Sequence, residues 1–583
     1  MTGAGLASLL PLAIAIPITA ATVAPLLARV SKRAAIAVCI AATTAAGVLL
    51  LLMAPTVYRG HELTHFLGNW APFSGHELGD TLAADPLGLT FALTVSGVGV
   101  VLLVYSLSEL PGLGPRELGG YACLFQLLIA ALIGVALTAD IVNLFVWFEV
   151  AALSSYGLTG FFLERPIALE AAFKTLVLTN MAGFAVFVGA AMIYSDHGAL
   201  NFGQIHQALI AHTTTADLVA LGLLLIGFAT KAGIIPFHSW LPDAHTAAPG
   251  PVSALFSGLM VELGVVVIAR LALQIYGHTA NHALLGLLTI AGCATAVLGA
   301  VLALAQDDLK RLLAYDTVSQ MGILIVGFAT GSASGVAGAV CHLISHSLFK
   351  ALLFLCAGAI VHATGLTNLS EMGGLARRMP VIAAAFVVGA AAIAGVPLLN
   401  GYVSLGLIHD SLRNTDPVAF AVVIVAQVVT IAALARAAHL AFFRPRRQPY
   451  EELARLHPGM VAGLAVLAVG CVASGVLAYP ILHHIAEPAA GGLLEPARYA
   501  NGVLSAGTTF AVPQVKFAYF SVLGIAISVG TIAAGLLVAW AYIRRSEPRL
   551  VTWLRAIHNG SANDYATYFA AGGALTIAAL IVR

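Results

Sequence analysis

Charged residues are scarce in this sequence. Only 9% of the 583 residues are Asp, Glu, Lys or Arg, whereas a soluble domain carries about 25%. Hydrophobic residues make up 60% of the chain, and a soluble protein of that composition would expose large apolar patches. The low charge therefore excludes a soluble enzyme. The formal net charge is only +1, so no basic surface for nucleic acid is predicted.

Cysteine is also rare. The six cysteines all lie in apolar stretches, and no two are close enough for a Cys-x-x-Cys pair. Zinc and iron–sulfur sites need clustered thiolates or imidazoles. The sequence also contains no nucleotide-binding motif that we can identify. We therefore predict no metal or other cofactor in this chain and interpret the thiols as small buried residues.

Long apolar runs, in contrast, are abundant. A membrane-spanning helix needs about 20 mostly apolar residues. About sixteen such runs can be placed, with about fourteen as a lower bound. We predict an all-α integral membrane protein whose spans lie near residues 4–28, 34–54, 87–108, 119–137, 141–163, 168–194, 217–241, 252–276, 281–304, 312–330, 335–363, 380–411, 417–443, 458–480, 517–543 and 565–582.

The spans divide the chain into three parts. Residues 1–84 hold the first helices and an outer loop, residues 85–443 form a core, and residues 444–583 hold the last helices. The two longer loops predicted on the outer side are residues 55–86 and the Gly-, Ala- and Pro-rich residues 481–516.

The positive charges predict an orientation. Cytoplasmic loops of membrane proteins are rich in Lys and Arg. If the N-terminus lies outside, most of the loop Lys and Arg residues fall in loops that become cytoplasmic, and the opposite orientation reverses this bias. We therefore expect a multi-pass protein of the cell membrane with both termini on the outer side.

Five basic residues fall inside predicted spans, where a charge at the bilayer centre costs several kcal/mol. Arg270 and Arg436 are placed where their side chains can extend from helix ends to the membrane surface. Lys174, Lys231 and Lys350 need another explanation.

Glu149 lies in the middle of the fifth span, within Phe145–Glu149. An isolated buried carboxylate would be protonated, and a nearby lysine could keep it ionised. Lys231 and Lys174 are the candidate partners. A static structural ion pair is the alternative, but buried pairs contribute little net stability.

The segment from Lys231 to Ser253 is rich in proline, with four prolines after a lysine in apolar sequence. Proline breaks a helix, and broken backbone at membrane depth is tolerated where it lines a polar or protein-buried cavity. Lys231 and His238 in this segment are therefore candidates for proton transfer. The alternative is that the prolines merely end the span at the surface, which leaves Lys231 unexplained.

In the eleventh span, His342, His346 and Lys350 recur at i, i+4 and i+8 and so share one helix face. Three titratable groups in register favour a proton relay. A zinc site is the competing interpretation, but no Glu follows the first His and a lysine completes the face.

Two further carboxylates lie inside spans. Glu262 in the eighth span needs a partner or a proton. Asp316 begins the tenth span just after Lys310 and Arg311, and a plain charge at the cytoplasmic end is an equally good interpretation.

These motifs resemble a known family. The segment 231–253, the following Ala-Leu-Phe-Ser-Gly, the run Gln306–Tyr315 and the His-x-x-x-His-x-x-x-Lys helix are similar to proton-conducting antiporter-like subunits. Such subunits occur in respiratory complex I, in Mrp-type sodium/proton antiporters and in energy-converting membrane hydrogenases. The resemblance covers roughly residues 85–440.

The resemblance implies two five-helix bundles related by inverted symmetry, near residues 119–276 and 281–443, each with one broken helix. It implies that Glu149 and Lys231 form the coupling pair of a first half-channel. It also implies that His342, His346 and Lys350 carry protons onward. The chain would work with other membrane subunits, and any flavin, iron–sulfur or nickel centres would sit on partner subunits.

Two positions depart from the family pattern. Many members have a lysine where Glu262 stands. A Lys or Glu usually follows a Gly-Phe-x-Ser-like sequence in the twelfth span, but here Leu405 follows Gly401–Ser404. His409 and Asp410, about one helical turn on, are the candidates to replace the missing outlet residue.

The leading functional prediction is a proton-translocating subunit of a complex I-like or hydrogenase-like redox complex, with no redox site of its own. The first alternative is a subunit of an Mrp-type antiporter that exchanges Na⁺ for protons. The second is a structural subunit with an impaired second half-channel. The candidate pathway residues are Glu149, Lys174, Lys231, His238, Glu262, His342, His346, Lys350, His409 and Asp410.

Overall fold

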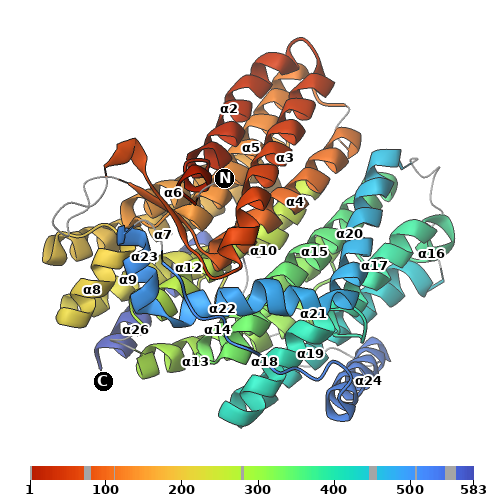
Figure 1. Ribbon diagram of the computed structural model, residues 1–583. Helices are drawn as coiled ribbons and strands as arrows, with labels where there is room; N and C mark the ends of the chain where they lie inside the picture. The colour runs from red at the N-terminus through yellow and green to blue at the C-terminus, as the bar shows by residue number, and fades with distance from the viewer. Residues whose placement is uncertain are drawn as a thin grey trace.

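A computed structural model describes residues 3–70, 80–109, 112–277, 281–445, 456–505, 508–544 and 560–582. Within these ranges the chain is helical apart from one antiparallel hairpin, β1 (Leu63–Phe66) and β2 (Thr81–Ala84), and the connecting turns. Fifteen helices in the described residues are long and apolar enough to cross a membrane. Figure 1 shows them packed side by side in one body. The predicted all-α membrane fold is confirmed.

The long helices follow the predicted apolar runs to within a few residues at most ends. They are α2 (Leu10–Ala28), which follows the short α1 (Gly3–Ala7), α3 (Lys32–Val57), α4 (Pro86–Glu109), α5 (Pro115–Leu137), α6 (Ile141–Thr159), α7 (Pro166–His197), α9 (Thr215–Ala232), α13 (Asn281–Ala305), α14 (Leu309–Ala329), α15 (Ala333–Thr364), α19 (Pro417–Ala438), α20 (Pro458–Val476), α24 (Val522–Arg544) and α26 (Ala562–Ile581).

One long helix is interrupted by π-helical turns rather than by a break. It runs through α11 (Gly250–Leu255), a π-turn at Phe256–Met260, α12 (Val261–Ala269) and a second π-turn at Arg270–Ile275. Two more π-turns lie at His439–Phe443, after α19, and at Leu482–Ala486. Such turns often mark functional positions in helices.

Two spans are broken. Helix α9 ends at Ala232, and the chain resumes as α10 (Trp240–Ala247). The predicted span 380–411 consists of α17 (Pro380–Ile393) and α18 (Asn400–Thr415). Each predicted five-helix bundle thus holds one broken span, as the resemblance implies, and in both bundles it is the fourth span. The inverted symmetry itself stays a prediction.

The connections between helices lie on two faces. One, here called the basic face, carries Arg29, Arg165 and Arg311 at helix ends or in loops. The other, here called the hairpin face, carries β1 and β2. Isolated bridges join Leu82 to Thr138 and His61 to Thr509 on the hairpin face. Each span connects one face with the other.

The loop predicted over residues 55–86 contains the β-hairpin, while its residues 71–79, including His76 and Glu77, lie outside the described residues. The prediction of a loop over residues 481–516 is wrong for its first part. That part consists of the end of α21 (Ala478–Ile481), a π-turn, α22 (Glu487–Leu494) and α23 (Pro496–Ser505). Figure 1 shows α21 and α22, in light blue, lying across the membrane-crossing helices.

Helix forms in this segment because its apolar residues recur every three or four positions, despite the many Gly, Ala and Pro residues. The side chains of Leu482, Ala486, Ala489, Ala490 and Leu493 are all fully buried. They pack the segment against α4 and α15.

The short helices α8 (Phe202–Ala211) and α16 (Leu375–Arg378) lie in the connections on the hairpin face and the basic face, respectively. The last two spans lie apart from each other. Helix α24 packs on α19, and α26 packs on α9 (Figure 1).

Candidate functional site: a line of buried ionisable residues

Lys231 lies in the last turn of α9, where the helix breaks. Gly233 ends the helix in the left-handed region, with φ of +71°. The indole Nε1 of Trp240 donates to the carbonyl of Thr230 across the break, 2.8 Å away, and so satisfies a carbonyl that the helix end leaves free. The break thereby holds a lysine inside the protein, with its side chain fully buried.

The ammonium of Lys231 lies among a hydroxyl group and aromatic rings. Its Nζ lies 3.5 Å from Ser155 Oγ. The rings of Phe148 and Trp240 lie 5.6 and 6.0 Å from Nζ, within the range of a cation–π contact. None of these partners is a full counter-charge, so Lys231 can change its protonation state without breaking a strong ion pair.

Glu149 lies on α6 and is only partly buried, on the side that faces α7. Gly183 on α7 makes room for it, because a Cβ at that position would overlap the carboxylate oxygen. Among the described residues Glu149 forms no direct ion pair with either candidate lysine, although its charge acts on Lys231. The two residues of the coupling pair implied by the resemblance therefore make no direct contact in this structure, and their coupling stays a prediction.

Lys174 is in a different place from the one predicted. It lies near the basic-face start of α7 and pairs with Glu170 at 2.5 Å and with Asp243 at 3.2 Å. The side chain of Glu170 is 62% exposed. The expectation that Lys174 could be the partner of Glu149 is wrong, because Lys174 starts close enough to a helix end to reach carboxylates there.

Glu262 lies at the centre of a series of buried ionisable residues, here called the line. Its members are Lys231, Glu262, His342, His346, Lys350 and Asp316. The carboxylate of Glu262 contacts His346 Nδ1 at 2.8 Å and accepts a hydrogen bond from Ser347 Oγ at 2.7 Å. All three side chains are fully buried. Glu262 belongs to α12 and His346 to α15, so this contact joins the two predicted bundles. The carboxylate at this position therefore pairs with a histidine of the second bundle rather than with Lys231.

Lys350 pairs with a residue that the sequence left open. Its Nζ lies 2.5 Å from Asp316 Oδ2 and donates to the carbonyl of Leu313 at 3.1 Å. Both charged side chains are fully buried. The interpretation of Asp316 as a surface charge at the helix end is wrong. Its position two turns into α14 was the available signal, since a cytoplasmic-end charge belongs in the first turn.

The helix face predicted for α15 extends the line to α18. His342 contacts Ser404 Oγ through Nδ1 and Gln320 Oε1 through Nε2, both at 3.0 Å. The rings of His342 and His346 lie 6.5 Å apart. His342, His346 and Lys350 are all fully buried and lie next to one another, as the spacing predicts.

His238 lies in the break between α9 and α10. It is 4% exposed, and its ring lies 6.2 Å from the ring of Tyr315 on α14. This position is on the basic-face side of Lys231, away from the contacts of Glu262.

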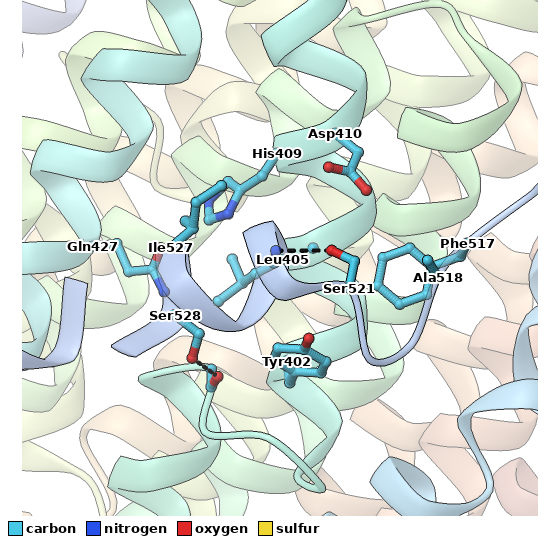
Figure 2. Close-up of a pocket in the computed structure, with 13 residues that line it drawn as sticks. Tyr402, Leu405, His409, Asp410, Gln427, Phe517, Ala518, Ser521, Ile527 and Ser528 are labelled. Atoms are coloured by element: carbon cyan, nitrogen blue, oxygen red, sulfur yellow. Dashed lines mark hydrogen bonds between the residues drawn. The ribbon is translucent and has the colours of Figure 1, made fainter. Parts of the chain in front are cut away.

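His409 and Asp410 lie on α18, beside a small cavity that also touches Leu405 and Gln427. His409 is buried, and its Nε2 has no hydrogen-bond partner among the described residues. Gln427 Oε1 is likewise unpartnered. Figure 2 shows these side chains around the cavity, with Asp410 on the side of Ser521 and Phe517.

Arg270 was expected at a membrane surface, and that expectation is wrong. Its guanidinium is 3% exposed and pairs with Asp85 at 2.5 Å. Gln274 and Tyr499 also contact it. Asp85 precedes α4 and could not be matched to Arg270 from sequence, because 185 residues separate them. This cluster joins the hairpin face to the core.

Comparison with known proteins identifies the family of this chain. A family model described as "NADH:quinone oxidoreductase/Mrp antiporter, TM" matches residues 138–430, about half of the chain, including Glu149, Lys231, Glu262 and Lys350. The chain belongs to this family. The predicted resemblance is thereby confirmed, and we refer to the protein below as an antiporter-like subunit.

Relatives of the antiporter-like subunit have different roles. It is 31% identical to NADH-quinone oxidoreductase subunit N of Desulforudis audaxviator, over 82% of this chain and 97% of the relative. It is also 31% identical to a Na⁺/H⁺ antiporter protein of Alkalihalophilus pseudofirmus, over 79% of this chain and 92% of the relative.

A chain in the solved structure of a membrane-bound sulfane sulfur reductase, an archaeal respiratory membrane complex, has the same fold. Its TM-score is 0.77 at 28% identity, with 85% of this chain and 99% of that chain covered. Relatives of this kind are subunits of multi-subunit membrane complexes, so other membrane subunits are the expected partners of the antiporter-like subunit.

Proposed function

We propose that the antiporter-like subunit translocates protons within a multi-subunit redox complex of the complex I or membrane hydrogenase type. The observation that carries this proposal is the pair of buried acid–base contacts on one face of α15, Glu262 with His346 and Lys350 with Asp316. Membrane proteins keep ionisable groups at such depth mainly along ion pathways.

The chemistry of the line favours protons over Na⁺. A hard cation such as Na⁺ is held by several oxygen ligands. The two buried carboxylates on the α15 face, Glu262 and Asp316, face an imidazole and an amine, and a lysine ammonium offers donors only. Alternating acids and bases can pass a proton from one to the next, whereas they cannot surround a metal cation.

Two other functions are kept as alternatives. An Mrp-type antiporter subunit is supported by the relative from Alkalihalophilus pseudofirmus, whose name states Na⁺/H⁺ exchange. A structural subunit with an impaired second half-channel is supported by Leu405 at the expected outlet position. In each case we propose that the basic face is cytoplasmic and that both termini lie outside, because loops rich in Lys and Arg stay inside.

The test is to purify the native complex that contains this protein and to reconstitute it in sealed vesicles. Proton movement on addition of an electron donor, unchanged when Na⁺ is replaced by K⁺, is the expected result. Proton movement driven by a Na⁺ gradient without any electron donor would instead favour the antiporter. No proton movement in either condition would favour the structural role.

The outlet of the line is the second part of the proposal. We assign it to His409 and Asp410. The small cavity beside His409 measures about 30 Å³, which is enough for a water molecule. Asp410 also lines a second pocket of about 890 Å³ on the hairpin face. Asp410 therefore borders both the inner cavity and the outer pocket.

A short step connects the outlet to the line. His342 contacts Ser404, and Ser404 precedes His409 by little more than one turn of α18. A proton that reaches His342 can pass through Ser404 or a water to His409 and leave past Asp410. In this arrangement the apolar side chain of Leu405 does not block the exit.

We predict that His409→Leu lowers proton flux about tenfold or more, because a positioned acid–base group typically contributes at least that much. Leu405→Lys alone should leave flux unchanged, and in the His409→Leu background it should restore flux by supplying the missing amine. Leu405→Met is the matched control. Flux measured in reconstituted vesicles checks this, and normal flux in His409→Leu would rule out the assigned outlet.

A further inference from the structure

His245 is a buried histidine that the line above does not use. It lies in α10, after the break of α9, and is fully buried. Neither of its ring nitrogens has a partner with good hydrogen-bond geometry among the described residues, and the backbone of Ser253 is a polar group that acts on the ring. Buried polar side-chain atoms almost always have a partner, so this ring needs an explanation.

The ring is held in a fixed position by its neighbours. It stacks on Phe354 with the centroids 4.8 Å apart and meets Phe256 edge-on at 6.0 Å. The carbonyl of His245 accepts a hydrogen bond from Ser253 Oγ at 2.9 Å. Phe354 follows Lys350 by one turn of α15, so the stack places the imidazole beside the Lys350 end of the line.

The charges of Lys350 and Lys310 both act on the imidazole. Lys310 lies near the basic-face start of α14, and its Nζ donates to the carbonyl of Ala248 at 2.8 Å. Ala248 follows α10 directly. His245 therefore lies between the Lys310 contact at the basic face and the buried Lys350.

A pocket on the basic face reaches this region. It has a volume of about 330 Å³, and the chain from Thr246 to Gly250 forms part of its wall. Glu109 and Lys310 line it, and one oxygen of Glu109 is buried there without a partner among the described residues. Gly250 allows the carboxylate to approach, because a Cβ at that position would lie 2.8 Å from Glu109 Oε1. The pocket thus places acidic and basic side chains beside the chain segment that directly follows His245.

We propose that His245 is the inlet relay that passes protons from this pocket to Lys350. The inference rests on the proposed function, because it uses Lys350 as a proton carrier. One ring nitrogen accepts a proton from water or from Lys310 at the pocket, and the other nitrogen gives its own proton to the neutral amine of Lys350. The ring is then neutral again with its proton on the other nitrogen, and a half-turn flip of the ring within the stack restores the starting tautomer. The donor at the pocket regains a proton from bulk water.

The environment suits a transient carrier. Burial and the two nearby lysine charges all oppose a stable positive charge on the ring. The imidazole therefore holds the extra proton only in transit. An imidazole can accept a proton on one nitrogen and donate from the other, whereas a lysine ammonium offers donors only.

The test compares wild type, Lys350→Ala and His245→Phe in the reconstituted complex. Phenylalanine keeps the stack on Phe354 and the contact with Phe256 but has no nitrogen. We expect His245→Phe to assemble normally and to lose proton flux about tenfold or more. His206→Phe, a buried histidine near the hairpin face, is the matched control, with flux per assembled complex close to wild type.

The outcomes separate the two claims. Normal flux in Lys350→Ala would overturn the proposed line and the inlet with it. Lost flux in Lys350→Ala together with normal flux in His245→Phe would overturn the inlet alone and leave His245 as a packing residue. If His245→Phe assembles poorly, His245→Gln is measured instead. Glutamine keeps polar atoms at this position but cannot take up and release a proton. Normal flux in assembled His245→Gln would also overturn the inlet.

A second measurement tests the access route. Thr246→Cys places a thiol in the pocket wall, and a charged, membrane-impermeant thiol reagent is added to the basic face. We expect labelling to block flux in this variant and not in the wild type with its native cysteines. Labelling that leaves flux unchanged would show that protons reach Lys350 by another way.

Discussion

Replacing Lys350 by alanine is expected to lower proton flux about 100-fold, since a positioned proton carrier contributes roughly that much. The substitution also leaves Asp316 buried with no counter-charge. An unpaired buried charge costs about 3–5 kcal/mol, so the remaining carboxylate will take up a proton and stay neutral. The line would then lack both of its charges at this point. Flux per assembled complex in reconstituted vesicles is the measurement.

A double variant separates transport from stability. Lys350→Ala with Asp316→Ala removes both charges, so it should assemble at least as well as the single variant while flux stays low. Lys32→Ala, at the basic-face start of α3, is the control and should behave like wild type. Recovery of flux in the double variant would mean that protons bypass Lys350, and the line as drawn would be incorrect.

Glu262→Gln is expected to lower flux about 100-fold as well, while the protein assembles normally. The amide oxygen of glutamine can still accept the hydrogen bond from Ser347. Its amino group can donate to Nδ1 of a neutral His346, so both contacts across α12 and α15 survive. What is lost is a group that can take up and release a proton between the two bundles.

Two comparisons make this result specific. Glu170→Gln changes the exposed acid beside Lys174 and should have little effect, because exposed ion pairs contribute about 1 kcal/mol or less. Glu262→Lys introduces the residue common in the family, but here it would face His346. We expect it to impair assembly, measured as the yield of intact complex. Wild-type flux in Glu262→Gln would show that the two bundles do not exchange protons through this residue.

Much of the architecture could be predicted from sequence because the bilayer imposes a simple rule. A helix that crosses lipid must be long and apolar, so apolar runs locate the spans. The lysine and the prolines of segment 231–253 also located the break in α9, and the i, i+4, i+8 spacing located the relay face of α15. These signals are local, and local signals survive without knowledge of the packing.

Partners could not be predicted in the same way, because they depend on which helices meet. Asp316 lies 34 residues from Lys350, and Asp85 lies 185 residues from Arg270. In both pairs, the sequence around one residue gives no indication of its partner. Lys174 was misplaced because an apolar run does not show how far along the helix the membrane surface lies. The helices over residues 478–505 were not predicted, because their Gly and Pro content is typical of loops even though their apolar residues have helical spacing.

The π-turn at Phe256–Met260 has a consequence for the register of Glu262. A π-turn accommodates one residue more than the α-helix would need. Successive residues of an α-helix point about 100° apart. Deleting one residue from this turn would therefore rotate α11 and everything before it relative to Glu262, or turn Glu262 away from His346. The single surplus residue sets the rotational phase that lets a carboxylate of one bundle meet an imidazole of the other.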